Sequence, residues 1–216
     1  MNLNIPFNQF TSALARRLQQ PLPGLAAHRL MASASRLKLM QSPNERTRRS
    51  AVLILFYPYL DLIHLPLILR PSYEGVHGGQ VAFPGGRVER TDESLVRTAL
   101  REAQEEIGIR VNDVTVLGQL TELFIPPSNF MVLPVIGCMA RKPDFYPDPH
   151  EVEAVFDVSL PELIDDQIRT SRTLDVRGVS VEAPGFVVHD YYVWGATAMM
   201  LSELLEVVRT GLGVES

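Results

Sequence analysis

The stretch that decides the fold reads FPGGRVERTDESLVRTALREAQEEIGI and runs from Phe83 to Ile109. Two glycines near its start precede a run with helical spacing, and Gly108 follows that run. We expect Thr91 to cap a helix over about 92–107, because a threonine side chain accepts hydrogen bonds from first-turn amides and glycine readily adopts the left-handed conformation that ends a helix. Apolar residues recur at helical spacing and predict one buried stripe, formed by Val96, Ala99, Leu100, Ala103 and Ile107.

Three carboxylates lie beside this stripe, at Glu102, Glu105 and Glu106. Residues three and four positions apart share one face of a helix, so the three charges are expected to crowd together and repel one another. A hard divalent cation would offset that repulsion, and magnesium is commonly shared between carboxylates and substrate phosphates. The other interpretation is a solvated acidic face, which is what most acidic runs on helices are.

With the glycines and Arg101, this spacing resembles the Nudix box, G-x5-E-x7-R-E-U-x-E-E-x-G-U, where U is a large aliphatic residue. The positions that match in register are Glu93, Arg101, Glu102, Glu105, Glu106, Gly108 and Ile109. Ala103 stands where the pattern has a large aliphatic residue. The opening glycine is Gly86, with Arg87 after it, so the turn is one residue longer than the general pattern.

The resemblance implies a Nudix-like α/β/α sandwich with a mixed central sheet, and the order of expected strands and helices suits that class. It implies metal-dependent hydrolysis of a diphosphate bond in a nucleotide derivative. Glu102, Glu105 and Glu106 would be the ligands of Mg²⁺ or Mn²⁺. Arg101 precedes Glu105 by one helical turn and could orient it through a charge-assisted hydrogen bond, the alternative being an ordinary surface ion pair.

The base that accepts a proton from the attacking water is not identified by the box. Members of the family often take this base from a loop after the box. Glu151 and Glu153 follow a proline-containing loop and are two candidates, and Glu105 is a third if no metal occupies it.

The segment before the box resembles the coenzyme A diphosphatase branch of the family, whose additional signature is roughly L-L-T-x-R-[SA]-x3-R-x3-G-x3-F-P-G-G. The residues that match it are Arg70, Gly79, Phe83, Pro84, Gly85 and Gly86. The residues that depart from it are Pro66, Ile68, Pro71 and Gly75, the last in place of a second arginine. The loss of that arginine keeps two alternatives open. One is a diphosphatase for ADP-ribose or NADH, and the other is a non-catalytic nucleotide-sensing module.

Several residues outside the acidic triplet are candidate substrate contacts. Arg70 could meet a phosphate, or it could be a strand-end arginine in water. His77 could reach the diphosphate from a glycine-rich loop, although most loop histidines have no such role. Gly85 and Gly86 would let the backbone approach the diphosphate, or simply serve a strand-to-helix turn. Asn129 lies in a loop that could border the substrate, or it could serve the turn itself.

Composition narrows the class of partner and the compartment. The 216 residues carry a net charge of −5 and show no basic stripe, so a small nucleotide substrate is expected rather than nucleic acid. The longest apolar stretch, Ala51 to Leu69, is interrupted by Pro58, Asp61, His64 and Pro66, which excludes a membrane-spanning helix there. The single Cys138 and the absence of signal-peptide features lead us to expect a cytoplasmic protein.

We expect an N-terminal helical appendage and linker over residues 1–45 and the hydrolase domain over 46–216. A helix is predicted over 8–19, and a homodimer through this appendage is a hypothesis. Buried strands are predicted over 51–57 and 65–70, around a turn at 58–64. The later predicted elements are strands over 114–125, 130–139 and 151–158, an extended loop over 141–150, a hairpin of 172–181 with 185–192, and a helix over 195–210.

Overall fold

Strand β1 (Arg48–Tyr59) is the centre of the fold, because three other strands pair with it. In the computed structural model, which describes residues 5–38, 42–71, 79–176 and 178–213, β1 is parallel to β7 (Phe130–Cys138) and antiparallel to β2 (Leu62–Leu69) and β4 (Gly85–Arg87). The same sheet also contains β3 (Val81–Ala82), β5 (Thr115–Gln119), β6 (Leu123–Ile125) and β8 (Ala154–Ser159). Within those ranges it has eight strands, and its mixed character is the one expected.

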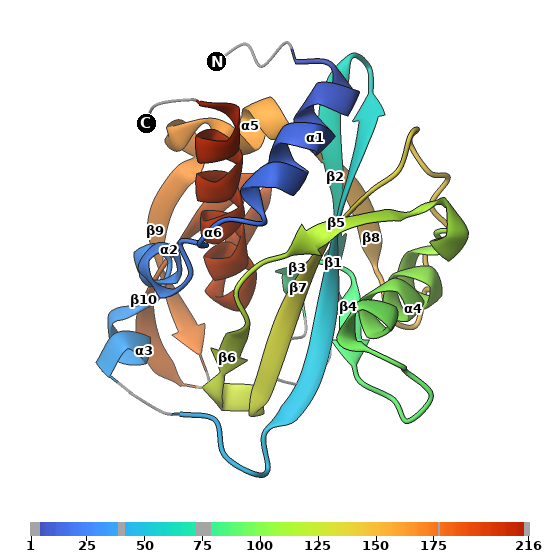
Figure 1. The fold of residues 1–216 in the computed structure, drawn as a ribbon. Helices are drawn as coiled ribbons and strands as arrows, with labels where there is room; N and C mark the ends of the chain where they lie inside the picture. Colours follow the sequence, from blue (N-terminus) through green and yellow to red (C-terminus); the bar gives the residue numbers. More distant parts are fainter. Residues whose placement is uncertain (1–4, 39–41, 72–78, 177, 214–216) are drawn as a thin grey trace.

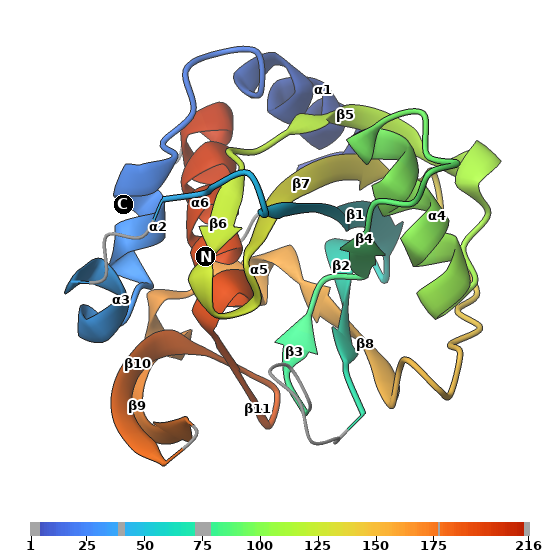
Figure 2. The ribbon, with the colours of Figure 1, turned by 90° about the horizontal axis from the view of Figure 1, so that it is seen from below.

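The helices cover both faces of this sheet, which explains why the sequence of β1 is a continuous apolar run. One face packs against α4 (Leu95–Ile107), and the other packs against α6 (Gly195–Leu212) and α1 (Phe7–Arg17), as Figures 1 and 2 show. Successive β1 side chains alternate between these faces. The residues on the α4 side are Ala51, Leu53, Leu55 and Tyr57, and those on the α6 side include Ile54 and Phe56. The α/β sandwich is therefore confirmed.

The hairpin between β1 and β2 has a shorter turn than predicted. Pro58 pairs with Ile63 inside the ladder, so the expected turn over 58–64 was wrong, and only Leu60 and Asp61 connect the strands. Both residues have positive φ angles, of 48° and 60°. Two-residue hairpin turns of this kind usually contain Asn or Gly, so the sequence predicts a turn in this region but does not locate it at Leu60 and Asp61.

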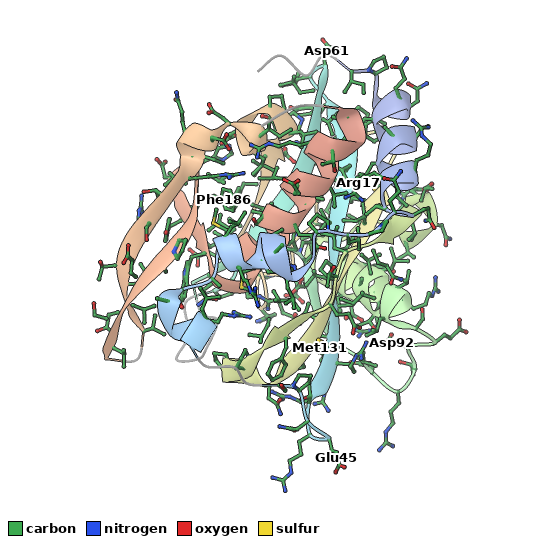
Figure 3. The ribbon with its side chains drawn as sticks, turned by 60° about the vertical axis from the view of Figure 1, so that its left-hand side comes forward. Arg17, Glu45, Asp61, Asp92, Met131 and Phe186 are labelled. Atoms are coloured by element: carbon green, nitrogen blue, oxygen red, sulfur yellow. The ribbon has the colours of Figure 1, made fainter. Side chains whose placement is uncertain are left out.

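A second sheet, of β9 (Arg169–Val176), β10 (Val179–Val188) and β11 (Tyr191–Trp194), lies beside α6. Phe186 of β10 is fully buried in the core that this sheet shares with α6 (Figure 3). The predicted hairpin was wrong in register, because the β9–β10 turn falls next to Gly178. Gly178 has a φ of 76°, and its amide donates to the Asp175 carboxylate at 2.8 Å, which fixes the turn there.

The N-terminal segment forms α1, α2 (Leu25–Leu30) and α3 (Ala34–Lys38), and α1 confirms the predicted first helix. Phe10 is fully buried, with its ring 5.0 Å from that of Phe56. Arg17 at the end of α1 donates to Thr210 of α6 at 2.8 Å (Figure 3). This segment therefore shares the main core, while the domain boundary at residue 45 stays a prediction. Strand β1 begins at Arg48, shortly after that predicted boundary.

A buried carboxylate ties the N-terminal segment to α6. Glu203 is fully buried and accepts hydrogen bonds from the Gly24 amide at 3.1 Å, from the Thr121 hydroxyl at 2.6 Å and from the His28 ring at 2.8 Å. Burial alone would raise the pKa of Glu203, but the hydrogen bonds from His28 and Thr121 lower it overall. These contacts hold α2 against α6. Because α3 follows α2 directly in the chain, they also restrict where α3 can lie.

The remaining elements are short. They are α5 (Leu160–Ile164) and the 3₁₀ turns Val111–Asp113, Pro126–Ser128 and Asp166–Ile168. The strand predicted over 114–125 is divided into β5 and β6, whereas the C-terminal helix is confirmed as α6 and the extended loop over 141–150 as a segment without helix or strand. Among the described residues, no helix has the length and apolar character that a membrane crossing requires.

Candidate metal and substrate site

The acidic helix α4 starts three residues later than predicted. Ser94, not Thr91, is its N-cap, and the Ser94 hydroxyl accepts a hydrogen bond from the Arg97 amide at 3.2 Å. Asp92 is excluded from the helix because its carboxylate binds the Thr98 hydroxyl and the Arg101 guanidinium instead. Gly108 ends the helix in the left-handed conformation, as the sequence predicts.

The glycine pair forms β4 and packs directly against α4. A β-carbon on Gly85 would overlap the backbone of Ala51 and Val52, and its φ of 155° disfavours any larger residue. A β-carbon on Gly86 would overlap the carboxylate of Glu102. Both glycines are therefore needed for close approach, Gly85 to β1 and Gly86 to the acidic face of α4.

Three carboxylates converge in front of β4: Glu102, Glu106 and Glu151. One oxygen atom from each lies within 4.8 Å of the other two. Glu106 is almost fully buried, whereas Glu151 is exposed. The Glu106 carboxylate accepts from the Gly85 amide at 2.7 Å and from the Arg70 guanidinium at 3.0 Å. The most buried carboxylate is thereby fixed from two sides.

The buried position raises the pKa of Glu106 to about 7, because burial disfavours its charged form. Arg70 and the Gly85 amide act in the opposite direction, while the nearby Glu102 and Glu151 raise the pKa further. Burial also raises the pKa of Glu102, against the lowering effect of Arg101. Concentrated negative charge of this kind is what a bound divalent cation would stabilise.

Glu151 reaches the cluster because the preceding loop is attached to the end of α4. The Tyr146 amide donates to the Ile107 carbonyl and the Asp148 amide to the Glu106 carbonyl, both at 3.0 Å. A turn closed by the Glu151 amide on Asp148 then directs Glu151 toward the cluster. Glu153, the neighbouring candidate base, is exposed and lies outside this group of three. The catalytic role of Glu151 stays a prediction.

Glu105 occupies a different place from the other two box glutamates. Its side chain is 54% exposed, and its carboxylate accepts a hydrogen bond from Arg101 at 2.7 Å. It is not part of the cluster of Glu102, Glu106 and Glu151. The predicted contact between Arg101 and Glu105 is present, whereas the roles of Glu105 as metal ligand and as base stay predictions.

Arg101 does more than the sequence indicates. It donates to both carboxylate oxygens of Asp92 and to the Arg87 carbonyl, all at 3.0 Å, and it lies 3.0 Å from a Glu102 oxygen. The strong hydrogen bond from Arg101 keeps the pKa of Asp92 far below its ordinary value. Arg101 thus connects the loop before α4 with two of the box carboxylates.

The other predicted contacts differ in their surroundings. Arg70 donates to the Gly85 carbonyl at 2.9 Å as well as to Glu106, so it lies directly beside the cluster. His77 lies outside the described residues. Asn129 has a φ of 52°, and its side chain accepts from the Thr47 hydroxyl and donates to the Arg46 carbonyl. Asn129 therefore serves its turn, and its predicted contact with substrate is untested.

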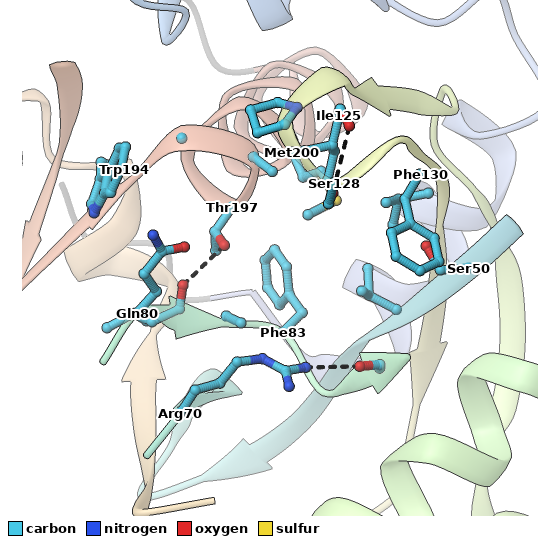
Figure 4. A pocket seen from close by; sticks show the side chains of 18 of the residues that line it. Ser50, Arg70, Gln80, Phe83, Ile125, Ser128, Phe130, Trp194, Thr197 and Met200 are labelled. Atoms are coloured by element: carbon cyan, nitrogen blue, oxygen red, sulfur yellow. Dashed lines mark hydrogen bonds between the residues drawn. The ribbon is translucent and has the colours of Figure 1, made fainter. Parts of the chain in front are cut away.

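A pocket of about 830 Å³ opens beside the carboxylates. Figure 4 shows Phe83 within it, Phe130 along one side, Thr197 and Met200 of α6 facing Phe83, and Arg70 directed toward the Gly85 carbonyl. The pocket residues that the sequence interpretation missed include Arg36, Phe83 as a wall residue, Phe130, Trp194, Thr197 and Met200. They come from segments far apart in the chain, and no local pattern marks them.

The donor set fits a hard divalent cation. Magnesium and manganese prefer carboxylate oxygens, and the three converging carboxylates supply them beside a pocket large enough for a nucleotide derivative. Gly86 supports this assignment, since the space that a β-carbon would fill is needed by the Glu102 carboxylate.

Fold and site together define a hydrolase of the Nudix class. The family model described as "NUDIX domain" matches residues 47–190, and the chain belongs to this family. Nudix hydrolases act on nucleoside diphosphate derivatives and generally use divalent metal ions. The expected small-molecule nucleotide substrate and the hydrolase class are therefore confirmed at this level.

Among individual proteins, the chain is 36% identical over 166 residues to an uncharacterized Nudix hydrolase NudL from Pectobacterium atrosepticum, covering 75% of this chain and 83% of the relative. It is 34% identical over 163 residues to a NudL from Yersinia pestis, covering 74% and 80%. The fold is similar to that of the Nudix hydrolase RenU from M. smegmatis, with a TM-score of 0.53, 19% identity and coverage of 76% and 87%. A MutT/nudix family protein from Enterococcus faecalis gives a TM-score of 0.50 at 18% identity, covering 97% of this chain and 80% of that one.

Proposed function

We propose that this protein hydrolyses the diphosphate bond of coenzyme A or its thioesters, giving 4′-phosphopantetheine and 3′,5′-adenosine bisphosphate. One observation carries the proposal. The residues that resemble the coenzyme A diphosphatase signature line the same pocket as Glu102, Glu106 and Glu151, with the exception of Pro84: Arg70, Gly79, Phe83, Gly85 and Gly86. The signature and the acidic cluster therefore face one ligand-sized space.

In this proposal Glu102 and Glu106 hold Mg²⁺ or Mn²⁺, and Glu151 beside them is either a third ligand or the base. The chemistry that a bound divalent cation supplies is charge neutralisation on phosphoryl oxygens and a lower pKa for an attacking water. Arg70 orients the diphosphate, since its guanidinium already lies beside Glu106 and has further N–H donors for phosphate oxygens. The water oxygen bonds to phosphorus, the bridging P–O bond breaks, and a carboxylate accepts the water proton.

The accepting carboxylate is Glu151 or Glu105, with Glu153 as the third candidate. Glu151 is exposed and adjacent to the buried carboxylates, so it can reach a water at the site. Glu105 accepts a hydrogen bond from Arg101 at 2.7 Å, which orients its carboxylate. The single cysteine supports placing this activity in the cytoplasm, a reducing compartment. The homodimer through the N-terminal segment stays a prediction.

ADP-ribose or NADH are the alternative substrates, because Gly75 replaces the second arginine of the signature. A nucleotide-sensing module without turnover is the third interpretation. The three converging carboxylates favour catalysis over sensing, since nucleotide binding alone does not require a carboxylate cluster that could hold a divalent cation.

The proposal is tested by offering coenzyme A, ADP-ribose and NADH separately with Mg²⁺ or Mn²⁺ and identifying the products by mass spectrometry. We expect coenzyme A to be the preferred substrate, with activity lost in Glu106→Gln. Glu206→Gln is the matched control, because Glu206 is exposed on α6, away from the carboxylate cluster. A preference for ADP-ribose or NADH would show that coenzyme A is not the substrate and that the preferred nucleotide is. No turnover of any of the three with either metal would favour the sensing module.

A further inference from the structure

Arg36 on the N-terminal helix α3 is a pocket residue that the proposed reaction does not use. Its guanidinium donates to the Phe124 carbonyl of β6 at 2.7 Å, and it contributes to the wall of the 830 Å³ pocket. A guanidinium has five N–H donors in a fixed plane, so the contact with Phe124 leaves donors available toward the pocket.

The positive charge of Arg36 has no carboxylate partner among the described residues. Asp175 lines the same pocket, but its carboxylate accepts from the Gly178 amide and forms no ion pair with Arg36. Burial lowers the pKa of Arg36, and no charge among the described residues opposes that effect. A partly dehydrated cation without a counter-charge gains more from an incoming anion than an exposed one does.

Arg36 is well separated from the acidic cluster. Helices α3 and α4 lie on opposite sides of the molecule in both views, with β6 and β7 between them (Figures 1 and 2). The pocket nevertheless includes Arg36 of α3 and Glu102 and Glu106 of α4, and Ile125, Phe130 and Met200 are apolar members of its wall. A ligand whose diphosphate lies at the cluster can therefore meet Arg36 only through another part of its structure.

We propose that Arg36 binds a phosphate monoester that the substrate carries in addition to its diphosphate. This proposal deepens the proposed function and rests on it, since coenzyme A has such a group in its 3′-phosphate. A phosphate monoester suits the site because a guanidinium can donate two parallel hydrogen bonds to its oxygens. Arg36 is thereby a specificity-determining residue, supplied by a segment outside the matched family region of 47–190.

The direct test is metal-free binding of two nucleotides that differ only in this group, adenosine 3′,5′-bisphosphate and AMP, measured by calorimetry in EDTA. We expect the wild type to favour the bisphosphate by about 10- to 100-fold, the range of a charge-assisted hydrogen bond. Arg36→Gln should reduce this preference to about threefold or less, and Arg36→Lys should retain part of it. AMP affinity should be similar in all three proteins.

Equal affinity of the wild type for both nucleotides, or no measurable binding of either, would overturn the proposal. A preference that persists in Arg36→Gln would overturn it as well. The Phe124 contact gives Arg36 a structural role too, so thermal unfolding of each variant is recorded. If Arg36→Gln is unfolded, the wild-type preference and its reduction in Arg36→Lys still decide the matter.

Turnover separates this proposal from the function on which it rests. The substrates are matched pairs, coenzyme A with 3′-dephospho-coenzyme A and NADPH with NADH. Cleavage of coenzyme A and its dephospho form at equal kcat/KM would refute the role of Arg36 and keep the proposed function. If the protein prefers the bisphosphate through Arg36 but does not cleave coenzyme A, the binding role of Arg36 would stand and the proposed substrate would be wrong.

Discussion

The Gly85 amide donates a hydrogen bond to the Glu106 carboxylate at 2.7 Å, so the glycine strand and the acidic helix are joined at the most buried carboxylate of the cluster. Arg70 contacts both partners, donating to the Gly85 carbonyl and to Glu106. The residue expected to orient the diphosphate and the residue expected to hold the metal are thus positioned by the same glycine. Loss of any one of these contacts should affect both functions together.

Stability without metal should decrease as pH rises, because of Glu106. Its pKa is about 7 in the folded protein, above the ordinary glutamate value of the unfolded chain, so between these values the folded state holds more protons. The free energy of unfolding should therefore fall by up to about 3 kcal/mol between pH 5 and pH 8. Urea unfolding in EDTA measures this, and Glu106→Gln should flatten the dependence. An equally steep dependence in the variant would show that another group is responsible.

Divalent cations should stabilise the protein through the cluster. Binding to the folded state alone at 100 times Kd contributes about 2.7 kcal/mol, which is a rise in melting temperature of roughly 5 to 10 °C for a chain of this size. This rise is measured by comparing the calorimetric melting temperature in Mg²⁺ or Mn²⁺ with that in EDTA. Glu106→Gln should abolish the rise, whereas Glu206→Gln should keep it. A rise that survives in Glu106→Gln would place the metal elsewhere.

The two glycines of β4 should respond differently to alanine. In Gly86→Ala the new methyl group displaces the Glu102 carboxylate, which can rotate away, so metal affinity should fall at least about tenfold with unfolding changed by less than about 1 kcal/mol. In Gly85→Ala the methyl group meets the backbone of β1, and stability should fall by about 2 kcal/mol or more. Calorimetric metal titration and urea unfolding of both variants separate the effects. Equal loss of stability would contradict this division.

Glu151→Gln and Glu153→Gln compare neighbouring candidates for the base. We expect Glu151→Gln to lower kcat/KM at least about 100-fold, because Glu151 lies beside Glu102 and Glu106, and Glu153→Gln to change it far less. Unchanged metal affinity in Glu151→Gln would identify a base, and weakened affinity would identify a ligand. Full activity of Glu151→Gln would exclude both roles and direct attention to Glu105.

The N-terminal segment should be required for stability. Phe10→Ala removes a fully buried ring that packs on Phe56 and should destabilise the protein by about 3 to 5 kcal/mol. Leu25→Ala is the control in the same segment, because Leu25 is 64% exposed, and it should cost under about 1 kcal/mol. Urea unfolding measures both. A small effect of Phe10→Ala would show that α1 can detach from the core.

Features governed by local periodicity could be predicted from the sequence. The stripe of α4 and its terminating Gly108 were correct, since apolar spacing and glycine conformation act within a few residues. The start of α4 was not, because Asp92 bonds to Arg101, nine positions away, and leaves the capping role to Ser94. The turn at Leu60 and Asp61 was predicted too long, over 58–64, for a related reason. Pairing of long strands holds these two residues in conformations that their own side chains disfavour.

In the candidate site, too, features set by local spacing could be predicted and features set by long-range contacts could not. The three box glutamates and the contact of Arg101 with Glu105 could be predicted from spacing, but spacing could not show that Glu151 joins Glu102 and Glu106. The position of Glu151 depends on backbone contacts between the proline-containing loop and the end of α4, which no side-chain pattern records. The pocket lining from Arg36 and Trp194 could not be predicted either, since these two residues come to line one pocket only after the chain has folded.

The pocket wall also has an evolutionary consequence. Its carboxylates lie within the family region of 47–190, whereas Arg36, Trp194, Thr197 and Met200 lie before or after it. Mutations in these flanking segments can therefore alter which nucleotide is accepted without disturbing the residues that surround the reacting phosphorus. A lineage could acquire a new substrate by exchanging its two ends, with the hydrolytic centre inherited unchanged.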